Sequence, residues 1–385
     1  MRFPAFVAAI FLAAMVSACG GSDSTAPTTG TLAFHIVTTG FDIDSDGYLV
    51  DIDGQSRMIP ANGTMTVEAS PGTHSLAING LAFNCDITAP ASASVAVGTT
   101  TTVDVQATCV PYLRNAIVYV SEEFGGAVMA MRPDGSRRVQ LTTDNQVYAS
   151  PAVSPDGKSI AVAWGATWDG IYVFDRFGKT RTKLVGHGNL DAEPAWSPDG
   201  TKLAFRSLVP SPYGGNVGRI FVANSDGSGL RQLTPDVSPG HPNPYDATPS
   251  WSPDGARILF TRSGDISIIN VDGTGLVSTG VDGDSPSWSA DGSHIAFQSV
   301  IGGNTGGGGN VAIYTMDMTF APHAVTTPVQ SDQMPRWSPD GSQIVFARAE
   351  NNVFHLYKIQ ADGSGLVKLS TSTLSDSWPS WTKGF

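Results

Sequence analysis

Six near-copies of one short motif, Pro-x-Trp-Ser-Pro-Asp-Gly, dominate the C-terminal two-thirds of the sequence. They lie at 151–157, 194–200, 249–255, 286–292, 335–341 and, in a shortened form, 379–384. The motif serines at 154, 197, 252, 289 and 338 give spacings of 43, 55, 37 and 49 residues. A repeat near 40 residues long with about four strands predicts the blades of a β-propeller.

Each repeat contains the residues that an up-and-down sheet of four strands requires. Ser-Pro-Asp-Gly predicts a type I turn, because proline presets its second position, aspartate suits the third and glycine tolerates a positive φ at the fourth. β-rich segments follow, as at 202–205 and 219–222. A second tight turn, as at 224–227, then leads to a fourth strand that ends in Leu-Thr or a similar pair.

The two ends of the repeat array predict how the ring closes. Residues 115–120 match the second strand of a repeat, and residues 378–381 match a first strand. One blade is therefore expected to combine both ends of the array, which removes exposed sheet edges. Five complete repeats and this composite blade predict an all-β, six-bladed propeller over 111–385.

These motifs resemble the repeats of the TolB-type propellers, and the resemblance covers about residues 112–385. TolB is a soluble periplasmic protein that binds the lipoprotein Pal, so the resemblance implies a binding role in the cell envelope. This chain departs from TolB in two respects: it carries a lipoprotein-like start, and its N-terminal region looks all-β. The resemblance therefore supports the scaffold more directly than the specific role of TolB.

The first residues predict export and a lipid anchor. Arg2 precedes a short apolar run at 6–16, which is the pattern of a secretory signal over 1–18. The residues Val16-Ser17-Ala18-Cys19 resemble the bacterial lipobox, which implies that Cys19 is acylated and that the protein is held in the membrane. Gly20 after the cysteine favours the outer membrane, facing either the periplasm or the medium. The alternative is an ordinary signal peptide with an incidental cysteine, and residues 19–30 read as a flexible tether.

A small β-sandwich is predicted for residues 31–110. Short alternating segments are separated by turn signals such as Asp53-Gly54 and Asn62-Gly63. The pattern resembles immunoglobulin-like or PEGA-like modules. Besides Cys19, Cys85 and Cys109 are the only cysteines, and in an exported chain they are expected to form a disulfide within this domain.

An acidic segment in this domain has the spacing of a calcium-binding loop. Asp42, Asp44 and Asp46 precede Gly47, and Asp53 stands eleven positions after Asp42. Strand-like sequence flanks the segment where an EF-hand has helices, so the competing interpretation is a solvated acidic turn. Beyond this possible calcium site, no cofactor is expected.

Charge and motif content narrow the function. The formal net charge is −12, from 34 acidic and 22 basic residues, and such a surface repels phosphate backbones, so nucleic acid is not an expected partner. The sequence lacks a Gly-x-Ser-x-Gly elbow, an HExxH motif and a complete phosphate-binding loop. Related repeats occur in pectin-fragment lyases, which need channel histidines that hold a metal; here only His187 and His241 lie in suitable loops.

Aromatic residues gather in one set of loops. In an up-and-down blade, the connections between strands 2–3 and 4–1 lie on one face, and here they are long and variable, while the opposite connections are short turns. Long loops on a rigid scaffold usually carry recognition. The predicted partner-binding face therefore contains Tyr148, Trp164, Trp168, His187, Tyr213, His241 and Tyr245, with Trp168 and Tyr245 as anchors, although several of these rings are expected to pack between blades. Acidic residues lie among them at Glu122, Glu123, Asp169, Glu193 and Asp284.

A recurrent aspartate stands three positions before the repeat proline, at Asp191, Asp246, Asp332 and Asp376. The favoured interpretation is that these carboxylates accept hydrogen bonds from backbone amides, and the alternative is a carboxylate ring that attracts a cation.

Together these observations favour a non-catalytic, membrane-tethered propeller that binds an envelope protein or glycan. A glycan-processing lyase and a structural spacer are the alternatives.

Overall fold

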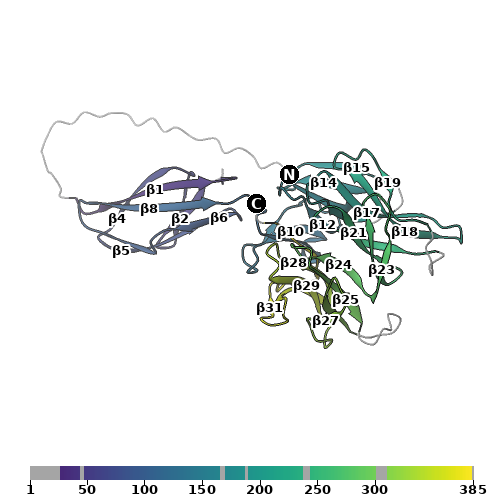
Figure 1. Ribbon diagram of the computed structural model, residues 1–385. Helices are drawn as coiled ribbons and strands as arrows, with labels where there is room; N and C mark the ends of the chain where they lie inside the picture. Colours follow the sequence, from purple (N-terminus) through teal and green to yellow (C-terminus); the bar gives the residue numbers. More distant parts are fainter. Residues whose placement is uncertain are drawn as a thin grey trace, which may run out of the picture. The chain divides into compact units, whose positions relative to one another are not determined.

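The computed structural model describes residues 27–43, 47–164, 170–186, 190–236, 243–300 and 310–383. The chain forms two compact units (Figure 1). The sandwich unit comprises residues up to Val37, Gly47–Asn79 and Thr88–Gln106. The propeller unit comprises Thr38–Asp46, Gly80–Ile87 and Ala107–Phe385. Within the described ranges there is no α-helix, so the predicted all-β class is confirmed.

The first eight strands form two four-stranded sheets, with the orders β4-β1-β8-β6 and β3-β2-β5-β7. Alternate residues of β1, such as Leu32, Phe34 and Ile36, are buried, as expected for a sheet with one face against a core. Asp53 and Gly54 both have positive φ and turn the chain between β2 and β3. The bounds are β1 (Gly30–Gly40), β2 (Tyr48–Ile52), β3 (Gln55–Ile59), β4 (Thr64–Ala69), β5 (Gly72–Asn79), β6 (Cys85–Thr88), β7 (Ser92–Val95) and β8 (Thr100–Cys109).

Six further four-stranded sheets, counted over the described residues, form the blades of the propeller unit. Blade 1 contains β32 (Asp376–Trp381), β9 (Ile117–Ser121), β10 (Ala127–Met131) and β11 (Val139–Gln140), with a short 3-10 turn at Glu122–Phe124. Blade 2 contains β12 (Tyr148–Val153), β13 (Ser159–Trp164), β14 (Ile171–Asp175) and β15 (Arg181–Val185). Blade 3 contains β16 (Ala192–Trp196), β17 (Lys202–Pro210), β18 (Asn216–Asn224) and β19 (Arg231–Gln232).

The remaining blades follow the same order along the chain. Blade 4 contains β20 (Asp246–Trp251), β21 (Arg257–Arg262), β22 (Asp265–Asn270) and β23 (Val277–Asp282). Blade 5 contains β24 (Asp284–Trp288), β25 (His294–Val300), β26 (Val311–Asp317) and β27 (Pro322–Ala324). Blade 6 contains β28 (Asp332–Trp337), β29 (Gln343–Glu350), β30 (Val353–Gln360) and β31 (Val367–Lys368).

The first strands of the blades surround the propeller axis. Each contacts the first strand of the next blade, in the order β12, β16, β20, β24, β28, β32 and back to β12. The C-terminal strand β32 pairs with β9, with Asp376 opposite Ser121 and Trp381 opposite Ile117. The six blades and the closure by both ends of the array are therefore confirmed.

Apolar residues at equivalent repeat positions form the core between blades. The second strands contribute phenylalanines that are almost fully buried, at Phe205, Phe260, Phe297 and Phe346. Burial of each such ring stabilises the fold by about 1.5–3 kcal/mol. The motif tryptophans add specific bonds, since Nε1 of Trp196 donates to the Ala152 carbonyl at 3.1 Å and that of Trp251 to Ala195 at 3.0 Å. Each of these two indoles therefore joins its blade to the preceding one.

Candidate functional site

The propeller unit has two faces built from different connections. The turn face carries the connections between strands 1–2 and 3–4, and the loop face carries those between strands 2–3 and 4–1 of successive blades. On the turn face, Ser154 to Lys158 join β12 to β13. The loop-face connections vary in length, from Gly283 alone between β23 and β24 to residues 233–245 between β19 and β20. The prediction that these connections are variable is therefore correct, but the prediction that they are long holds only for some blades.

The turn face is fixed by the predicted Ser-Pro-Asp-Gly turns. In blade 3, Ser197 Oγ donates to Asp199 Oδ1 at 2.6 Å, and the Thr201 amide donates to the same oxygen at 3.0 Å. These hydrogen bonds hold the pKa of Asp199 at about 2. Gly200 has a φ of 71°, a backbone conformation that is strained for a residue with a side chain. The motif aspartates thus act locally in turns and are not free to bind a partner.

A bulge interrupts every first strand, just before the repeat proline. The pairing register shifts at this point in all six blades. The residue before the proline is never glycine, yet its φ lies between 50° and 58°, at Ser150, Glu193, Thr248, Ser285, Met334 and Trp378. Such residues cost about 1–3 kcal/mol each and persist only where the surroundings hold them. Here polar side chains help: Glu193 Oε2 accepts from the Thr248 amide at 2.7 Å, and Gln298 Oε1 accepts from the Met334 amide at 2.7 Å.

The recurrent aspartates before these bulges are fully buried, and three of them accept hydrogen bonds from side chains. Arg262 Nη1 donates to both carboxylate oxygens of Asp246, at 2.9 and 3.0 Å. Arg348 donates to Asp332 through Nε at 2.6 Å and Nη2 at 2.8 Å. Asp376 accepts from Ser372 and lies 3.5 Å from Arg138.

Burial raises the pKa of Asp246 to about 6, although Arg262 favours the ionised form. In place of the expected backbone amides, the partners are guanidinium groups for Asp246 and Asp332, and the Ser372 hydroxyl with a nearby guanidinium group for Asp376. The same neutralised carboxylates give no support to a cation-attracting ring.

Two of the predicted contact aromatics are packed into the blades. Tyr148 is only 2% exposed, and its hydroxyl donates to Asp144 Oδ2 at 2.6 Å. Trp164 is half-buried against Tyr172, with the Arg181 guanidinium 4.5 Å from its ring centroid. Tyr148 is therefore a core residue, and the Arg181 guanidinium covers one face of the Trp164 ring.

Two other predicted aromatics are exposed on the loop face. Tyr213, between β17 and β18, is 68% exposed, and Tyr245, before β20, is 44% exposed. The Arg206 guanidinium lies 5.9 Å from the Tyr245 ring centroid, which is within the range of a cation–π contact. Trp168, His187 and His241 lie outside the described residues.

Further apolar side chains extend this exposed set around the loop face. Seven large apolar residues in loop-face connections are 39–78% exposed, namely Phe124, Val147, Leu190, Tyr213, Tyr245, Val329 and Leu374. We call them the loop-face apolar set. The turn-face connections and the residues beside them also carry exposed apolar side chains, which are 36–54% exposed, at Phe177, Leu230, Val277, Met318, Leu366 and Val367. The two most exposed residues of both groups, Val329 and Tyr213, lie on the loop face. Of the seven loop-face residues, only Tyr213 and Tyr245 belong to the predicted partner-binding face. The other five carry no signal in the sequence that separates them from apolar residues of the core.

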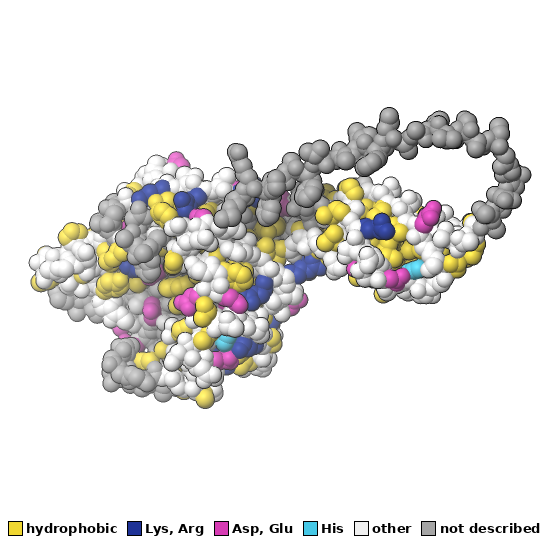
Figure 2. Space-filling model, turned by 180° about the vertical axis from the view of Figure 1, so that it is seen from behind, with side chains coloured by type: hydrophobic (Ala, Val, Ile, Leu, Met, Phe, Trp, Pro, Cys, Tyr) yellow, Lys and Arg dark blue, Asp and Glu magenta, His cyan; other side chains and the backbone are white. Residues whose placement is uncertain are grey.

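Charge does not single out a patch on the side drawn in Figure 2, where basic and acidic side chains are interspersed over the described part of the propeller unit. This side of the propeller unit therefore shows no large region of one charge that could attract a partner. Exposed apolar side chains are the better marker of a contact surface.

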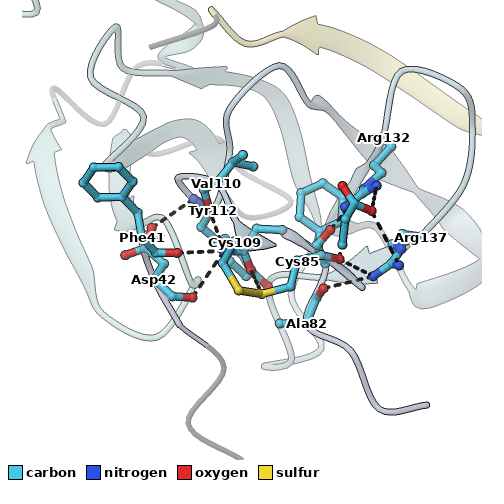
Figure 3. The surroundings of a disulfide bond; sticks show 12 residues. Phe41, Asp42, Ala82, Cys85, Cys109, Val110, Tyr112, Arg132 and Arg137 are labelled. Carbon is cyan, nitrogen blue, oxygen red and sulfur yellow. Dashed lines mark hydrogen bonds and ion pairs between the residues drawn. A yellow bond between two sulfur atoms is a disulfide. The ribbon is translucent and has the colours of Figure 1, made fainter. Parts of the chain in front are cut away.

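The disulfide between Cys85 and Cys109 is present, and it lies within the propeller unit (Figure 3). Arg137 Nη1 donates to the Cys85 carbonyl at 2.7 Å, and Arg132 Nη2 donates to it at 3.2 Å. Arg132 also pairs with Asp86 at 2.6 Å. These bonds from blade 1 explain why Gly80–Ile87 groups with the propeller unit, whereas the prediction for residues 31–110 places this segment in the small domain.

Two of the four calcium candidates have other partners. Asp42 pairs with Arg176 and accepts from the Tyr112 amide at 2.9 Å. Asp53 pairs with His74 at 2.6 Å, and this bond lowers the pKa of Asp53 and raises that of His74. Asp44 and Asp46 lie outside the described residues. Across the described ranges, no three His, Cys, Asp or Glu side chains are grouped as metal ligands, so we assign no calcium site.

The sequence matches the TolB beta propeller domain (PD40) over residues 108–384, which is well over half of the chain. The chain belongs to the TolB β-propeller family. No protein of curated function matches its sequence.

Solved structures agree with the fold of this TolB-type propeller. TolB from Acinetobacter baumannii is 23% identical with a TM-score of 0.59, and the match covers 70% of this chain and 67% of that one. The TolB of Agrobacterium tumefaciens, described as putative, is 20% identical with a TM-score of 0.51, over 67% and 88% of the two chains. An oligogalacturonate lyase in complex with manganese is 15% identical with a TM-score of 0.46, over 63% and 70%. The two TolB structures support the fold, and the lyase likeness is too weak to support an argument.

Cys19 and the signal segment lie outside the described residues. Across the part that is described, no helix has the length and apolar character needed to cross a bilayer.

Proposed function

We propose that this protein is an exported lipoprotein whose propeller binds a protein partner in the cell envelope without catalysing a reaction. Membership of the TolB β-propeller family supports an envelope role. The lipobox-like sequence that ends at Cys19 supports a lipid anchor, and Gly20 favours the outer membrane.

The loop-face apolar set carries this proposal. Its members come from seven different connections around one face, and Val329 and Tyr213 are 78% and 68% exposed. Apolar side chains exposed together on a rigid scaffold commonly mark interaction sites, and tyrosine is a frequent anchor. Because a protein interface buries such groups from water, the set fits a protein partner better than a purely structural spacer.

We do not propose the alternative function, a glycan-processing lyase. The histidines that it needs, His187 and His241, lie outside the described residues.

Removing the loop-face tyrosines is expected to weaken partner binding by about tenfold or more each, which is the effect of losing an interface anchor. The detergent-solubilised full chain would be immobilised and exposed to envelope extract, and bound proteins would be quantified for wild type, Tyr213→Ala and Tyr245→Ala. Retention of polysaccharide in place of protein would redirect the proposal to a glycan partner.

Leu366→Ala is the matched control, because Leu366 is 44% exposed on the turn face. The motif aspartates make poor controls, since Asp254 accepts bonds within its own turn. Thermal unfolding of all variants checks that the fold is intact. Weaker binding by Leu366→Ala, with both tyrosine variants unchanged, would place the partner on the turn face.

Cys19→Ser is expected to release the protein from the membrane fraction, because acylation supplies the proposed anchor. The measurement compares membrane and soluble fractions after a carbonate wash. Ser17→Ala leaves the cysteine in place and should remain bound. A Cys19→Ser variant that stays with the membrane would show that the anchor lies elsewhere.

A further inference from the structure

The first strands of the blades enclose an axial channel with a volume of about 250 Å³. Residues from all six blades line it, and the prolines of three motif turns, Pro155, Pro198 and Pro253, lie among them. Because these turns belong to the turn face, the channel reaches the side of the propeller opposite the loop-face apolar set.

One residue breaks the symmetry of this channel. The position after the repeat proline holds alanine or serine in five blades, at Ala152, Ala195, Ser250, Ser287 and Ser380. In blade 6 the same position holds Arg336, which lines the channel together with four of the small residues. A ring of small side chains thus leaves room around a single guanidinium group.

The hydrogen-bonding capacity of Arg336 is only partly used. Its Nη1 donates to the Pro335 carbonyl at 2.8 Å and lies 3.4 Å from the Ser285 carbonyl. Among the described residues, no hydrogen bond from Nε or Nη2 and no ion pair within 4.0 Å is present. The residue is half-buried, and burial lowers the pKa of Arg336.

The two carboxylates that act electrostatically on Arg336, those of Glu193 and Asp284, are bonded to other groups. Glu193 pairs with Arg206 at 3.2 Å. Asp284 Oδ1 accepts from the hydroxyls of Thr248 and Thr261 at 3.2 and 3.0 Å. The negative charges of Glu193 and Asp284 favour the charged form of Arg336, but neither carboxylate forms a hydrogen bond or a close ion pair with it. The guanidinium therefore has donors that remain available to a ligand.

We propose that the axial channel is a binding site for an oxyanion, a carboxylate or a phosphate carried on a small molecule, with Arg336 as the binding residue. The planar guanidinium fork matches two oxygens of either group and forms strong charge-assisted bonds. Lys383 and Glu193 also line the channel. Because Glu193 is paired with Arg206, Lys383 adds a second positive charge, while Trp378 offers an apolar surface for the body of the ligand. The site is independent of a partner on the loop face.

The test measures the melting temperature of the detergent-solubilised full chain with acetate and, separately, with inorganic phosphate. Each anion is raised to about 100 mM at constant ionic strength with chloride as the balance, since a ligand that binds only the folded state raises that temperature. For wild type we expect a saturable rise of a few degrees. The anion that acts at the lower concentration identifies the group.

Arg336→Ser tests the residue without disturbing the repeat, because serine already stands at this position in three blades. We expect this variant to fold and to lose the saturable rise. Arg336→Lys keeps the charge but not the fork and should weaken binding at least tenfold. A rise of equal size in wild type and Arg336→Ser, or no rise in wild type with either anion, would overturn the proposal.

Discussion

Deletion of residues 376–385 is expected to abolish cooperative unfolding of the propeller unit. The deletion removes β32, which supplies blade 1 with its first strand and contacts β28 and β12 on either side. It would leave the buried strand β9 with an open edge and would also remove Thr382, whose Oγ1 accepts from the Ala116 amide at 2.7 Å. Because net stability is only about 5–15 kcal/mol, we expect aggregation or a broad, non-cooperative transition.

Circular dichroism during heating, together with light scattering, measures this effect. Deleting residues 383–385 alone is the matched control, because it leaves β32 and Thr382 in place. A melting transition of the longer deletion that is as sharp and as high as that of wild type would contradict the closure.

Asp246→Ala is expected to destabilise the propeller unit by about 3–5 kcal/mol, the usual cost of leaving a buried charge without its partner. Asp246 is fully buried and Arg262 is only 2% exposed, so water cannot replace the lost carboxylate. Arg262 would lose both of its bonds to the carboxylate, while its bond to the Pro235 carbonyl, at 2.9 Å, does not neutralise its charge.

Denaturant unfolding monitored by tryptophan fluorescence measures the free energy of unfolding. Asp282→Ala is a suitable control, because Asp282 is exposed on β23 and its loss should cost within about 0.5 kcal/mol. The double variant Asp246→Ala/Arg262→Leu should recover part of the loss, since it also removes the buried positive charge that Asp246 neutralises. A loss below about 1 kcal/mol for Asp246→Ala would show that the pair is not important for stability.

The blades and their closure could be predicted from the sequence because their signals are local and repeated. Ser197, Pro198, Asp199 and Gly200 determine one turn through bonds within six residues, and the same pattern recurs in other blades. The composite blade followed from the strand type at each end of the array, which needs no knowledge of distant contacts.

The details of the candidate site depend on contacts between distant residues, which a single sequence does not reveal. Asp246 meets Arg262 from the next strand, and the sequence did not distinguish that arginine from a backbone amide as the partner. Tyr148 and Tyr245 both lie where the chain enters the first strand of a blade, yet Tyr148 begins β12 and is buried, while Tyr245 precedes β20 and is exposed. Arg336 could have been noticed as the one large residue at a position otherwise held by alanine or serine.

Photo-crosslinking tests the proposed partner surface most directly. A photoreactive p-benzoylphenylalanine would replace Tyr213 or Tyr245 on the loop face, or Leu366 on the turn face, and intact cells would be irradiated. We predict adducts to the same envelope protein from positions 213 and 245 and none from position 366, which has a similar exposure to that of Tyr245. Adducts from position 366, with none from positions 213 and 245, would contradict a partner-binding loop face.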